Sequence, residues 1–448
     1  MIQAREIAAK ILNNIHKNNT YANITLANAF SKYELNDFDR RFITELVYGT
    51  LKLSNTIDWI LCQYTSRPLK KIPPVICEIL RLGIYQLFFL NKIPASAICN
   101  EATELAKKYT HPGTVKFVNA VLRAAAREPQ KASFSILKNS PVKYIAIKYG
   151  HPDWLVKNWI EEYGYEATKK LCDFNNSPAL LSIRANTLKI SRDELIKILN
   201  DEGVKTVPSE WTDCGIHCIE HPALDKLQSL KKGLFQVQDE SSMQVGFVVN
   251  PLPGEFIIDA CSAPGGKTTH MAEIMKNKGR IVAFDIYDEK LKRINENAKR
   301  LGITIIETKN FDARNIGNAY PNMADKVLVD APCSGLGVLR RKPDARWRKD
   351  KKDLDNLPKL QMEILCSAAK AVKPGGVLVY STCTITKAEN QAIIDKFLKI
   401  HPEFHVENTG SYLPIKKSNN SLVQFYPHID NIDGFFIARM KRAGKNEN

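Results

Sequence analysis

The chain of 448 residues lacks an apolar run of the roughly 18–20 residues that a membrane-spanning helix requires. Its longest candidate, residues 79–90, is shorter and contains Arg81. No signal peptide is recognisable after Met1. Ten cysteines are scattered without a close-set framework, a pattern that disfavours disulfides and favours a reducing compartment. We therefore expect a cytoplasmic protein that does not use a membrane.

Two common phosphate-binding patterns are missing from a glycine-rich turn at residues 256–270, read FIIDACSAPGGKTTH. A P-loop would need glycine where Cys261 stands, and the Gly-x-Gly of a dinucleotide fingerprint is absent. What remains is a strand, a turn with Gly265 and Gly266, and a helix N-terminus, which together suit a ligand that approaches the backbone. A second predicted strand ends in Asp285, where a carboxylate could bind ribose hydroxyls or could be an ordinary acid at a strand end.

Acidic residues are too few to balance the basic ones. Lysine and arginine number 64 against 48 aspartates and glutamates, a net charge of +16 that favours a polyanionic partner. Part of the excess lies after Cys333 and surrounds one tryptophan, in a pattern that suits phosphate neutralisation and base stacking. A solvated basic loop is the alternative. The predicted RNA-contacting residues are Arg340, Arg341, Arg346, Trp347 and Arg348.

Two apolar segments each end at a cysteine. Residues 327–337 read VLVDAPCSGLG and residues 377–384 read VLVYSTCT, which places Cys333 and Cys383 just after predicted strands. Ligands of open α/β sheets bind beyond the carboxyl ends of the strands, so both thiols could act on one substrate. The alternative is that both are buried small hydrophobic residues.

A third group of cysteines, near the middle of the chain, could suggest zinc, since Cys214, His217, Cys218 and His221 lie close together. However, residues 215–220 alternate like a strand, which separates His217 from the two cysteines, and the usual Cys-x-x-Cys spacing is absent. No metal is expected.

The pattern of apolar residues changes twice along the chain. Residues 2–127 show helical spacing without a convincing strand, and residues 129–141 read as a linker. Residues 153–233 mix helices at 154–163 and 192–202 with a strand-like stretch at 180–187, which indicates a small α+β module. From residue 234 strands alternate with helices, as in a doubly wound α/β sheet. The predicted domains are residues 1–130, 131–233 and 234–448.

These motifs together resemble the S-adenosylmethionine-dependent RNA 5-methylcytosine methyltransferases. The resemblance rests on the loop from Cys261 to Lys267, Asp285, Asp312, the segment 330–335 and the Ser-Thr-Cys at 381–383. Stretches 80–90, 92–100 and 116–123 are similar to the RsmB/Fmu branch, whose N-terminal domain resembles the helical antitermination factor NusB. Ser262 and Leu336 depart from the family pattern, where alanine and threonine are usual.

The resemblance implies an all-α NusB-like RNA-binding domain, a small α+β module that also binds RNA and a Rossmann-like methyltransferase domain. It implies that Cys383 attacks carbon 6 of cytosine, that Cys333 assists release and that Asp330 faces the base. The cofactor S-adenosylmethionine would then contact Asp285, Asp312, Asp330 and the loop Cys261, Ser262, Ala263, Pro264, Gly265, Gly266 and Lys267.

The expected function is that of a monomeric enzyme which forms 5-methylcytosine in small-subunit (16S) ribosomal RNA. A transfer RNA cytosine methyltransferase would share every catalytic motif, and only the helical N-terminal region argues against it. A non-catalytic RNA-binding factor is disfavoured by the intact Cys333, Cys383 and Asp330. A DNA cytosine methyltransferase usually carries only the Pro-Cys nucleophile, so the second cysteine disfavours it.

Overall fold

The computed structural model describes residues 2–415 and 420–444. Contacts divide the chain into two compact units. The first comprises residues 1–177 together with 339–348, and the second comprises residues 178–338 together with 349–448. The segment 339–348 therefore belongs to the first unit although the sequence on both sides of it belongs to the second.

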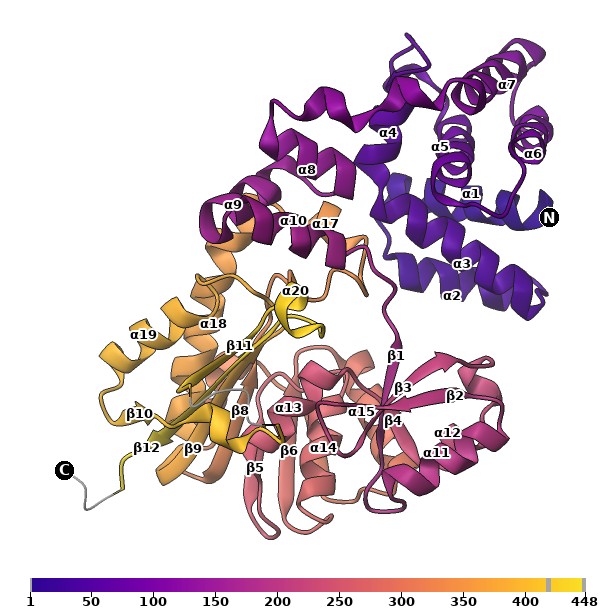
Figure 1. Ribbon diagram of the computed structural model, residues 1–448. Coiled ribbons are helices and arrows are strands. Elements are labelled where there is room, and N and C mark those ends of the chain that lie inside the picture. The colour runs from indigo at the N-terminus through magenta and orange to yellow at the C-terminus, as the bar shows by residue number, and fades with distance from the viewer. Residues whose placement is uncertain (1, 416–419, 445–448) are drawn as a thin grey trace. The chain divides into compact units, whose positions relative to one another are not determined.

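The first unit is helical in the part of the chain that the structure describes, and it confirms the predicted N-terminal bundle (Figure 1). Its core is formed by aliphatic residues from several helices, such as Leu12, Val47 and Leu80, which are fully buried. The helices are α1 (Ile2–Asn18), α2 (Ala22–Lys32), α3 (Asp37–Lys52), α4 (Ser54–Cys62), η1 (Leu69–Lys71), α5 (Pro74–Phe89), α6 (Ala95–Lys107), α7 (Pro112–Arg127), η2 (Pro129–Ala132), η3 (Phe134–Leu137), α8 (Pro141–Tyr149), α9 (Asp153–Tyr163), α10 (Tyr165–Phe174) and α17 (Ala345–Arg348).

Local sequence explains where several of these helices begin and end. The side chain of Asn36 caps α3 by accepting a hydrogen bond from the Asp39 amide. Helices α5 and α7 begin with Pro74 and Pro112, at a position where the missing N–H has no intrahelical partner. Helix α8 ends at Tyr149 and is followed by Gly150, whose φ of +66° is a left-handed conformation that glycine adopts without strain.

The second unit contains a small antiparallel sheet of strand order β2-β3-β1-β4. Ser191 and Glu194 form a capping box that starts the helix packed against it. The predicted strand at 180–187 and helix at 192–202 are thus confirmed, with bounds differing by one or two residues. The elements are β1 (Leu181–Ala185), α11 (Arg192–Asp201), β2 (Lys205–Pro208), β3 (Gly215–Glu220), η4 (Leu224–Lys226), α12 (Gln228–Lys231) and β4 (Phe235–Val237).

The same unit holds the predicted large α/β sheet, of order β10-β12-β9-β8-β5-β6-β7 with β11 paired to β12. Strands β5 to β9 run parallel, and β12 is antiparallel to β9. The strands are β5 (Phe256–Asp259), β6 (Arg280–Asp285), β7 (Ile306–Asn310), β8 (Ala324–Asp330), β9 (Val372–Thr382), β10 (Phe404–Val406), β11 (Leu422–Phe425) and β12 (Phe435–Arg442).

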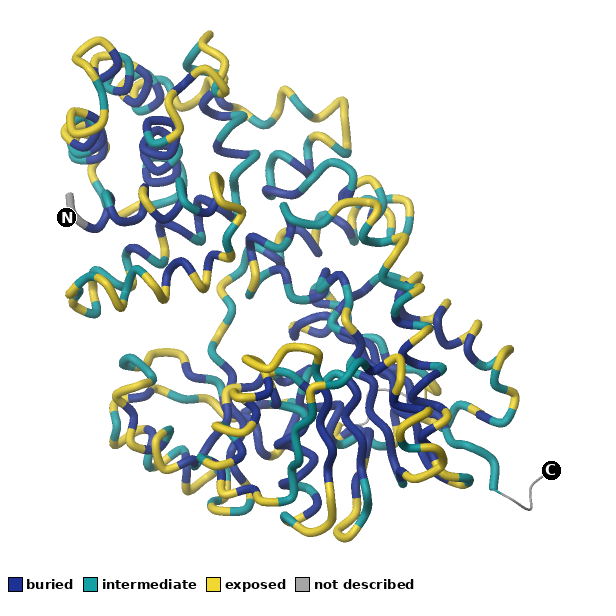
Figure 2. The backbone as a smooth tube through the Cα atoms, turned by 180° about the vertical axis from the view of Figure 1, so that it is seen from behind, coloured by how far each residue is buried: buried dark blue, intermediate teal, exposed yellow. Residues whose placement is uncertain are grey.

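Helices cover both faces of this sheet, and successive strand residues pack into two different cores. Ile257 and Leu328 pack on one face with helices that include α13 (Glu240–Val249), α14 (Gly266–Ile274) and α15 (Asp288–Leu301). Ile258 and Val327 pack on the other face with α16 (Ile316–Ala319), α18 (Lys351–Ala371) and α19 (Gln391–Ile400). The buried strands between exposed helix surfaces are visible in Figure 2. Two short helices, η5 (Ala313–Asn315) and η6 (Thr409–Tyr412), and α20 (Pro427–Asp430) complete the unit.

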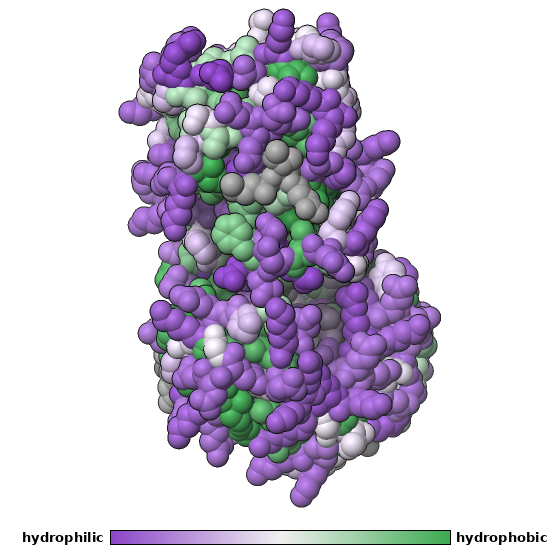
Figure 3. Space-filling view, turned by 90° about the vertical axis from the view of Figure 1, so that its right-hand side faces the viewer, coloured by the Kyte–Doolittle hydropathy of each residue, from purple (hydrophilic) through white to green (hydrophobic). Residues whose placement is uncertain are grey.

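Hydrophilic side chains cover most of the molecular face in Figure 3, with small apolar areas between them. Within residues 2–415 and 420–444, no helix combines the length and the apolar character that crossing a membrane requires.

Candidate active site

The two cysteines singled out in the sequence lie side by side at the carboxyl ends of neighbouring strands. Strands β8 and β9 are parallel, with Asp330 opposite Ser381. Cys333 follows the end of β8 by three residues and Cys383 follows the end of β9 directly. Their Sγ atoms are 3.3 Å apart. Because the register is set by the sheet, the pair is placed by the backbone rather than by a flexible side chain.

Backbone hydrogen bonds hold the two cysteine segments together. The Ala331 amide donates to the Ser381 carbonyl at 2.9 Å, and the Gly337 amide donates to the Cys383 carbonyl at 3.1 Å. A Cβ atom on Gly337 would lie 2.2 Å from the carbonyl oxygen of Gly434, so only glycine fits at this crossing. The segment after Cys333 is therefore fixed at both ends.

Sequence reasoning missed a buried acid that supports this segment. The Glu389 carboxylate accepts hydrogen bonds from the Ser334 amide at 2.8 Å, from the Ser334 hydroxyl and from Gln361 Nε2 at 2.9 Å. Glu389 is fully buried. The only signal in the sequence is an acid six residues after Cys383, which the pattern of strands and turns does not distinguish from a surface residue. Leu336, which departs from the family pattern, is also fully buried and contributes packing.

The environment of the two thiols differs. A hydrogen bond to Cys383, together with burial, raises the pKa of Cys333 well above its ordinary value. The raised pKa favours the protonated form of Cys333, which can then donate a hydrogen bond to the sulfur of Cys383. The ammonium group of Lys267 interacts electrostatically with Cys383, and a nearby cation favours a thiolate.

Asp330 is held by two donors at the end of β8. Lys267 Nζ lies 2.7 Å from Asp330 Oδ2, and the Ser381 hydroxyl donates to Asp330 Oδ1 at 2.9 Å. Lys267 Nζ also lies 5.0 Å from the centroid of the Phe435 ring. Burial lowers the pKa of Lys267, but the attraction of Asp330 outweighs it and the pKa is raised. Lys267 thus connects the glycine-rich loop to the cysteine pair.

The glycine-rich loop itself follows β5. Its Ala263–Pro264 peptide bond is cis, and Gly265 has φ +96°. Both the amide and the hydroxyl of Ser262 donate to the Phe284 carbonyl, at 2.9 and 2.8 Å, which gives the serine that departs from the family pattern a local role. Helix α14 starts at Gly266, so its first N–H groups point toward the loop without intrahelical partners.

Carboxylates surround this loop. Asp259 accepts from the Thr268 hydroxyl at 2.7 Å, while its buried Oδ1 has no hydrogen-bond partner among the described residues. Burial is the main cause that raises the pKa of Asp259 to about 7. Burial also raises the pKa of Cys261, and Asp259, Asp330, Asp285 and Asp312 add to that shift, which shows that these acids converge on one place.

The two remaining predicted cofactor residues lie at the ends of the next strands. Asp285 ends β6, and its Oδ1 accepts from the Tyr287 amide at 3.0 Å. Asp312 follows β7, and its carboxylate is paired with Arg314, which lowers the pKa of Asp312. The orphaned oxygen of Asp259, the free helix end and the acid at the end of β6 suit a ligand with a cationic group and a ribose. The residues present therefore fit S-adenosylmethionine.

The predicted RNA-contacting segment has a different role in the structure. Arg346 is fully buried in the first unit, where its guanidinium donates to the carbonyls of Gly150 at 2.8 Å, Asn175 at 3.2 Å and Lys52 at 3.3 Å. The prediction that Arg346 contacts RNA is wrong, because every approach to its guanidinium is filled by the protein. A run of arginines in a sequence does not reveal which of them turn inward.

Other residues of the segment 339–348 also make hydrogen bonds or ring contacts within the first unit. Trp347 Nε1 donates to the Leu51 carbonyl at 2.7 Å, and Arg348 Nη1 donates to the Asn19 carbonyl at 2.9 Å. The Arg340 guanidinium lies 4.7 Å from the centroid of the Phe174 ring. Arg340, Arg341, Trp347 and Arg348 are only partly buried, so RNA contact stays a prediction for these four.

The residues weighed for zinc do not assemble a metal site. Cys214 and Cys218 are buried, whereas the ring of His217 interacts with Ser182 Oγ at 3.2 Å and with Glu240 at 3.0 Å. Among the residues that the structure describes, no group of three or more histidine, cysteine or acidic side chains could hold a metal ion.

Comparison with known proteins decides the family. The model of the 16S rRNA methyltransferase RsmB/F family matches residues 246–441, the NusB family model matches residues 2–127, and an RsmF/B-like ferredoxin-like domain matches residues 151–223. A probable ribosomal RNA small subunit methyltransferase B of Bacillus subtilis is 39% identical over 98% of the chain and 99% of its own length. The chain belongs to the RsmB/F family.

The chain is also similar to solved structures over most of its length. The crystal structure of PH0851 has a TM-score of 0.81 and 30% identity, over 98% of this chain and 99% of that one. NSun6 from Pyrococcus horikoshii, determined with SFG, has a TM-score of 0.59 and 26% identity, over 66% of this chain and 99% of that one. The RsmB/F protein described here is thus an rRNA methyltransferase, and its predicted cofactor, S-adenosylmethionine, is confirmed.

Replacing Asp285 by alanine is expected to weaken S-adenosylmethionine binding by roughly 30- to 150-fold. A lost charge-assisted hydrogen bond to a buried hydroxyl pair costs on the order of 2–3 kcal/mol. Isothermal titration calorimetry measures the change, and Glu289→Ala, an exposed acid four residues away, serves as the control. An unaltered affinity in the Asp285 variant would remove this residue from the cofactor site.

Replacing Arg346 by alanine is expected to destabilise the first unit by about 3 kcal/mol or more, because several buried carbonyls lose their donor. Urea denaturation followed by tryptophan fluorescence suits this unit, which contains Trp59, Trp154, Trp159 and Trp347. Lys342→Ala, an exposed change in the same segment, should shift the free energy of unfolding by less than about 0.5 kcal/mol. Equal stabilities of the two variants would contradict the structural role of Arg346.

Proposed function

We propose that the protein forms 5-methylcytosine in small-subunit (16S) ribosomal RNA, with Cys383 as the nucleophile. The observation that carries this proposal is the pair of thiols 3.3 Å apart, beside the ion pair of Asp330 and Lys267. The relatives' names support ribosomal RNA of the small subunit as the substrate. The NusB-like helical region, matched over residues 2–127, supports an RNA substrate of the same kind.

The ion pair suits cytosine better than uracil. The Watson–Crick edge of cytosine carries an amino donor beside the N3 acceptor, whereas uracil presents an O4 acceptor beside an N3–H donor. A carboxylate only accepts hydrogen bonds and an ammonium only donates them. Asp330 would accept from the cytosine amino group while Lys267 donates to N3, and uracil would place like groups against each other. The target base must leave its stack to reach these groups, which favours an unpaired cytosine.

The thiols are required by the low nucleophilicity of cytosine carbon 5. The Cys383 thiolate would add to carbon 6, and the electron pair of the 5,6 double bond would then be available at carbon 5. S-adenosylmethionine supplies the electrophilic methyl group. Carbon 5 then carries both the methyl group and its original proton, and the base remains bonded to Cys383 through carbon 6.

Release reverses the addition. A base takes the proton from carbon 5, the double bond re-forms, and the sulfur of Cys383 leaves with the electron pair of its bond to carbon 6. Cys333, which keeps its proton, lies close enough to donate a hydrogen bond to the departing sulfur. Such a bond stabilises the thiolate as it forms, since hydrogen bonds to charged groups are stronger than neutral ones.

The two cysteine variants are expected to differ in kind. Cys383→Ala should form no covalent complex with RNA and no 5-methylcytosine, because nothing attacks carbon 6. Cys333→Ala should still attack and transfer the methyl group but release slowly, so that enzyme remains bonded to RNA. Denaturing gels of each variant incubated with 16S rRNA and S-adenosylmethionine show the complex as a slow band that nuclease treatment shifts.

Mass spectrometry of RNA nucleosides from the same reactions measures 5-methylcytosine. Cys366→Ala is a matched control, since this partly buried cysteine lies in α18 and has no role in the proposed mechanism. A trapped complex with Cys383→Ala would reverse the two roles. Ordinary turnover by a folded Cys383→Ala variant would refute the mechanism.

A further inference from the structure

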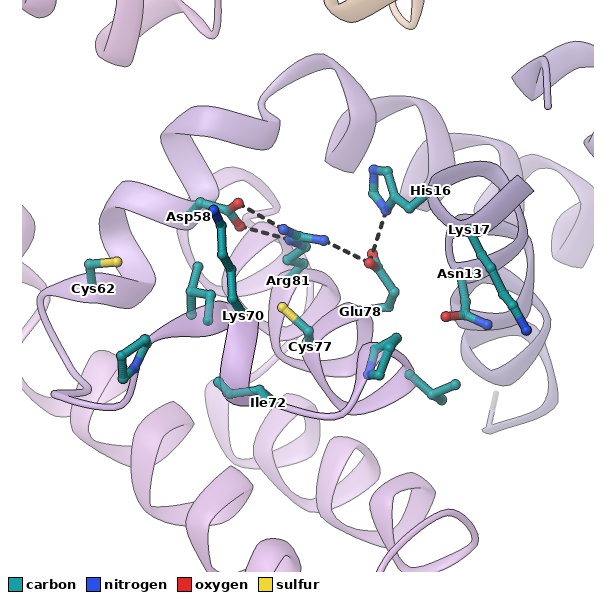
Figure 4. A pocket seen from close by; sticks show the side chains of 14 residues that line it. Asn13, His16, Lys17, Asp58, Cys62, Lys70, Ile72, Cys77, Glu78 and Arg81 are labelled. Atoms are coloured by element: carbon teal, nitrogen blue, oxygen red, sulfur yellow. Dashed lines mark hydrogen bonds and ion pairs between the residues drawn. The ribbon is translucent and has the colours of Figure 1, made fainter. Parts of the chain in front are cut away.

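Two buried glutamates of this protein have different kinds of partner. Glu78, in the first unit, is 2% exposed and accepts a hydrogen bond from the Arg81 guanidinium at 2.7 Å, while Arg81 also pairs with Asp58 (Figure 4). Glu389, in the second unit, is fully buried and accepts from four donors among the described residues, none of which is a cation. Its partners connect Glu389 to the cysteine site rather than to a counter-ion.

Glu389 and Gln361 hold the residues on either side of Cys333. The Ser334 amide donates to Glu389 Oε2 at 2.8 Å, and the Ser334 hydroxyl donates to Glu389 Oε1. Gln361 Nε2 donates to the Pro332 carbonyl at 3.0 Å and to Glu389 Oε2 at 2.9 Å. The backbone of Cys333 therefore cannot shift without breaking these bonds.

The next residue in the chain, Asn390, holds the other cysteine in a similar way. The Thr382 hydroxyl donates to Asn390 Oδ1 at 2.6 Å, and Asn390 Nδ2 donates to the Thr384 carbonyl at 3.1 Å. Thr382 and Thr384 are the chain neighbours of Cys383, and both are fully buried. Two consecutive residues of one turn thus hold the segments of both thiols.

The turn that carries these two residues is attached to the large sheet. The Tyr380 hydroxyl, on β9, donates to the Glu389 carbonyl at 2.8 Å. Asn390 Nδ2 also donates to Gln424 Oε1, on β11, at 2.8 Å. Because β9 ends directly before Cys383, the turn and the nucleophile are placed by the same strand.

We propose that Glu389 and Asn390 are positioning residues, Glu389 for Cys333 and Asn390 for Cys383. The inference rests on the proposed function, because it assigns each residue to one of its two steps. Asn390 holds Cys383 where the sulfur can add to carbon 6 of cytosine. Glu389 holds Cys333 where its thiol can donate a hydrogen bond to the sulfur as it departs. Both residues act through a cysteine rather than on the substrate.

The charge of Glu389 also acts on Cys333. The hydrogen bond to Cys383 and burial are the main causes that raise the pKa of Cys333, and the charges of Cys383 and Glu389 add to them. Glu389→Gln separates charge from position. Its oxygen can accept from the Ser334 amide and Gln361, while its amino group donates to the hydroxyls of Ser334 and Thr386, which can also accept.

Glu389→Ala is expected to slow release by about 100-fold, the usual effect of displacing a reacting group by about 1 Å. Enzyme bonded to RNA should then accumulate, as with Cys333→Ala. Glu389→Gln should release within about tenfold of the wild-type rate, because it keeps the geometry and loses only the charge. Denaturing gels of reactions with 16S rRNA and S-adenosylmethionine, sampled over time, measure the covalent complex.

The Cys333→Ala background measures the attack alone, because release is blocked there. Adding Glu389→Ala should leave the rate at which the slow band appears unchanged, since Glu389 acts only through Cys333. Adding Asn390→Ala should slow that rate by about 100-fold, because Cys383 is then displaced. A general structural role would slow the attack in both double variants.

Glu240→Ala controls for the loss of a buried acid. Glu240 is 4% exposed, and its partners Ser209 and His217 lie in or beside the small antiparallel sheet. This variant should trap no more complex than the wild type. Calorimetric affinity for S-adenosylmethionine shows which variants are folded.

Gln361→Met provides a second variant if Glu389→Ala does not fold. It removes the donor to the Pro332 carbonyl, while Gln361 Oε1 has no hydrogen-bond partner among the described residues to lose. Gln361→Met should also trap the covalent complex, because one neighbour of Cys333 is then no longer held.

Release at the wild-type rate by Gln361→Met or by folded Glu389→Ala would overturn the role of Glu389. Equal trapping by Glu389→Gln and Glu389→Ala would also overturn it, since charge rather than position would then be decisive. Unchanged attack after adding Asn390→Ala would overturn the role of Asn390. If Cys333→Ala itself traps no complex, the proposed function fails. If Cys333→Ala traps complex and the other variants behave as the wild type, only the positioning roles fail.

Discussion

The parallel pairing of β8 and β9 is the constraint on which the rest of the site depends. A one-residue slip of this register would turn every side chain of one strand to the opposite face. Both strands are buried between two layers of helices, so such a slip would expose apolar residues on one side and bury polar ones on the other. The packing of the core therefore also determines where Asp330, Ser381 and the two thiols lie.

The charge of the site is opposite to that of the whole chain. The protein carries a net charge of +16, but four aspartates converge near Cys261 with Lys267 as a partly buried cation among them. Acidic groups repel RNA phosphates and attract a sulfonium and an amino group. A cationic cofactor can thus be bound through its charges, whereas the phosphates of an RNA would have to be held through basic surfaces elsewhere.

The sequence predicted the strand ends well because they follow from apolar runs and the turns that stop them. Cys333, Cys383 and Asp330 were placed at neighbouring strand ends by that reasoning, and in the structure the two thiols are in contact and Asp330 is paired with Lys267. Glu389 was not predicted as a site residue, because its role depends on four hydrogen bonds that its carboxylate accepts only in the folded protein.

In the basic segment at residues 340–348, by contrast, a structural residue was predicted to be a functional one. Its composition is typical of an RNA-binding loop, yet Arg346 is surrounded by carbonyl groups from residues that are about 170 to 300 positions away in sequence. Composition gives the charge of a segment but not the direction of each side chain. Long-range partners of this kind, which depend on tertiary packing, cannot be recognised from one sequence.

The return of residues 339–348 to the first unit has a consequence for how the chain is made. Domains generally fold as units, beginning at the N-terminus while synthesis proceeds. Here the carbonyls of Lys52, Gly150 and Asn175 accept hydrogen bonds from Arg346. Arg346 is translated only after most of the second unit, so these carbonyls lack their donor until then. The helical unit emerges first from the ribosome but is completed late. Until residue 348 has been added, an incomplete chain contains carbonyl groups in the first unit whose hydrogen-bond donor is missing.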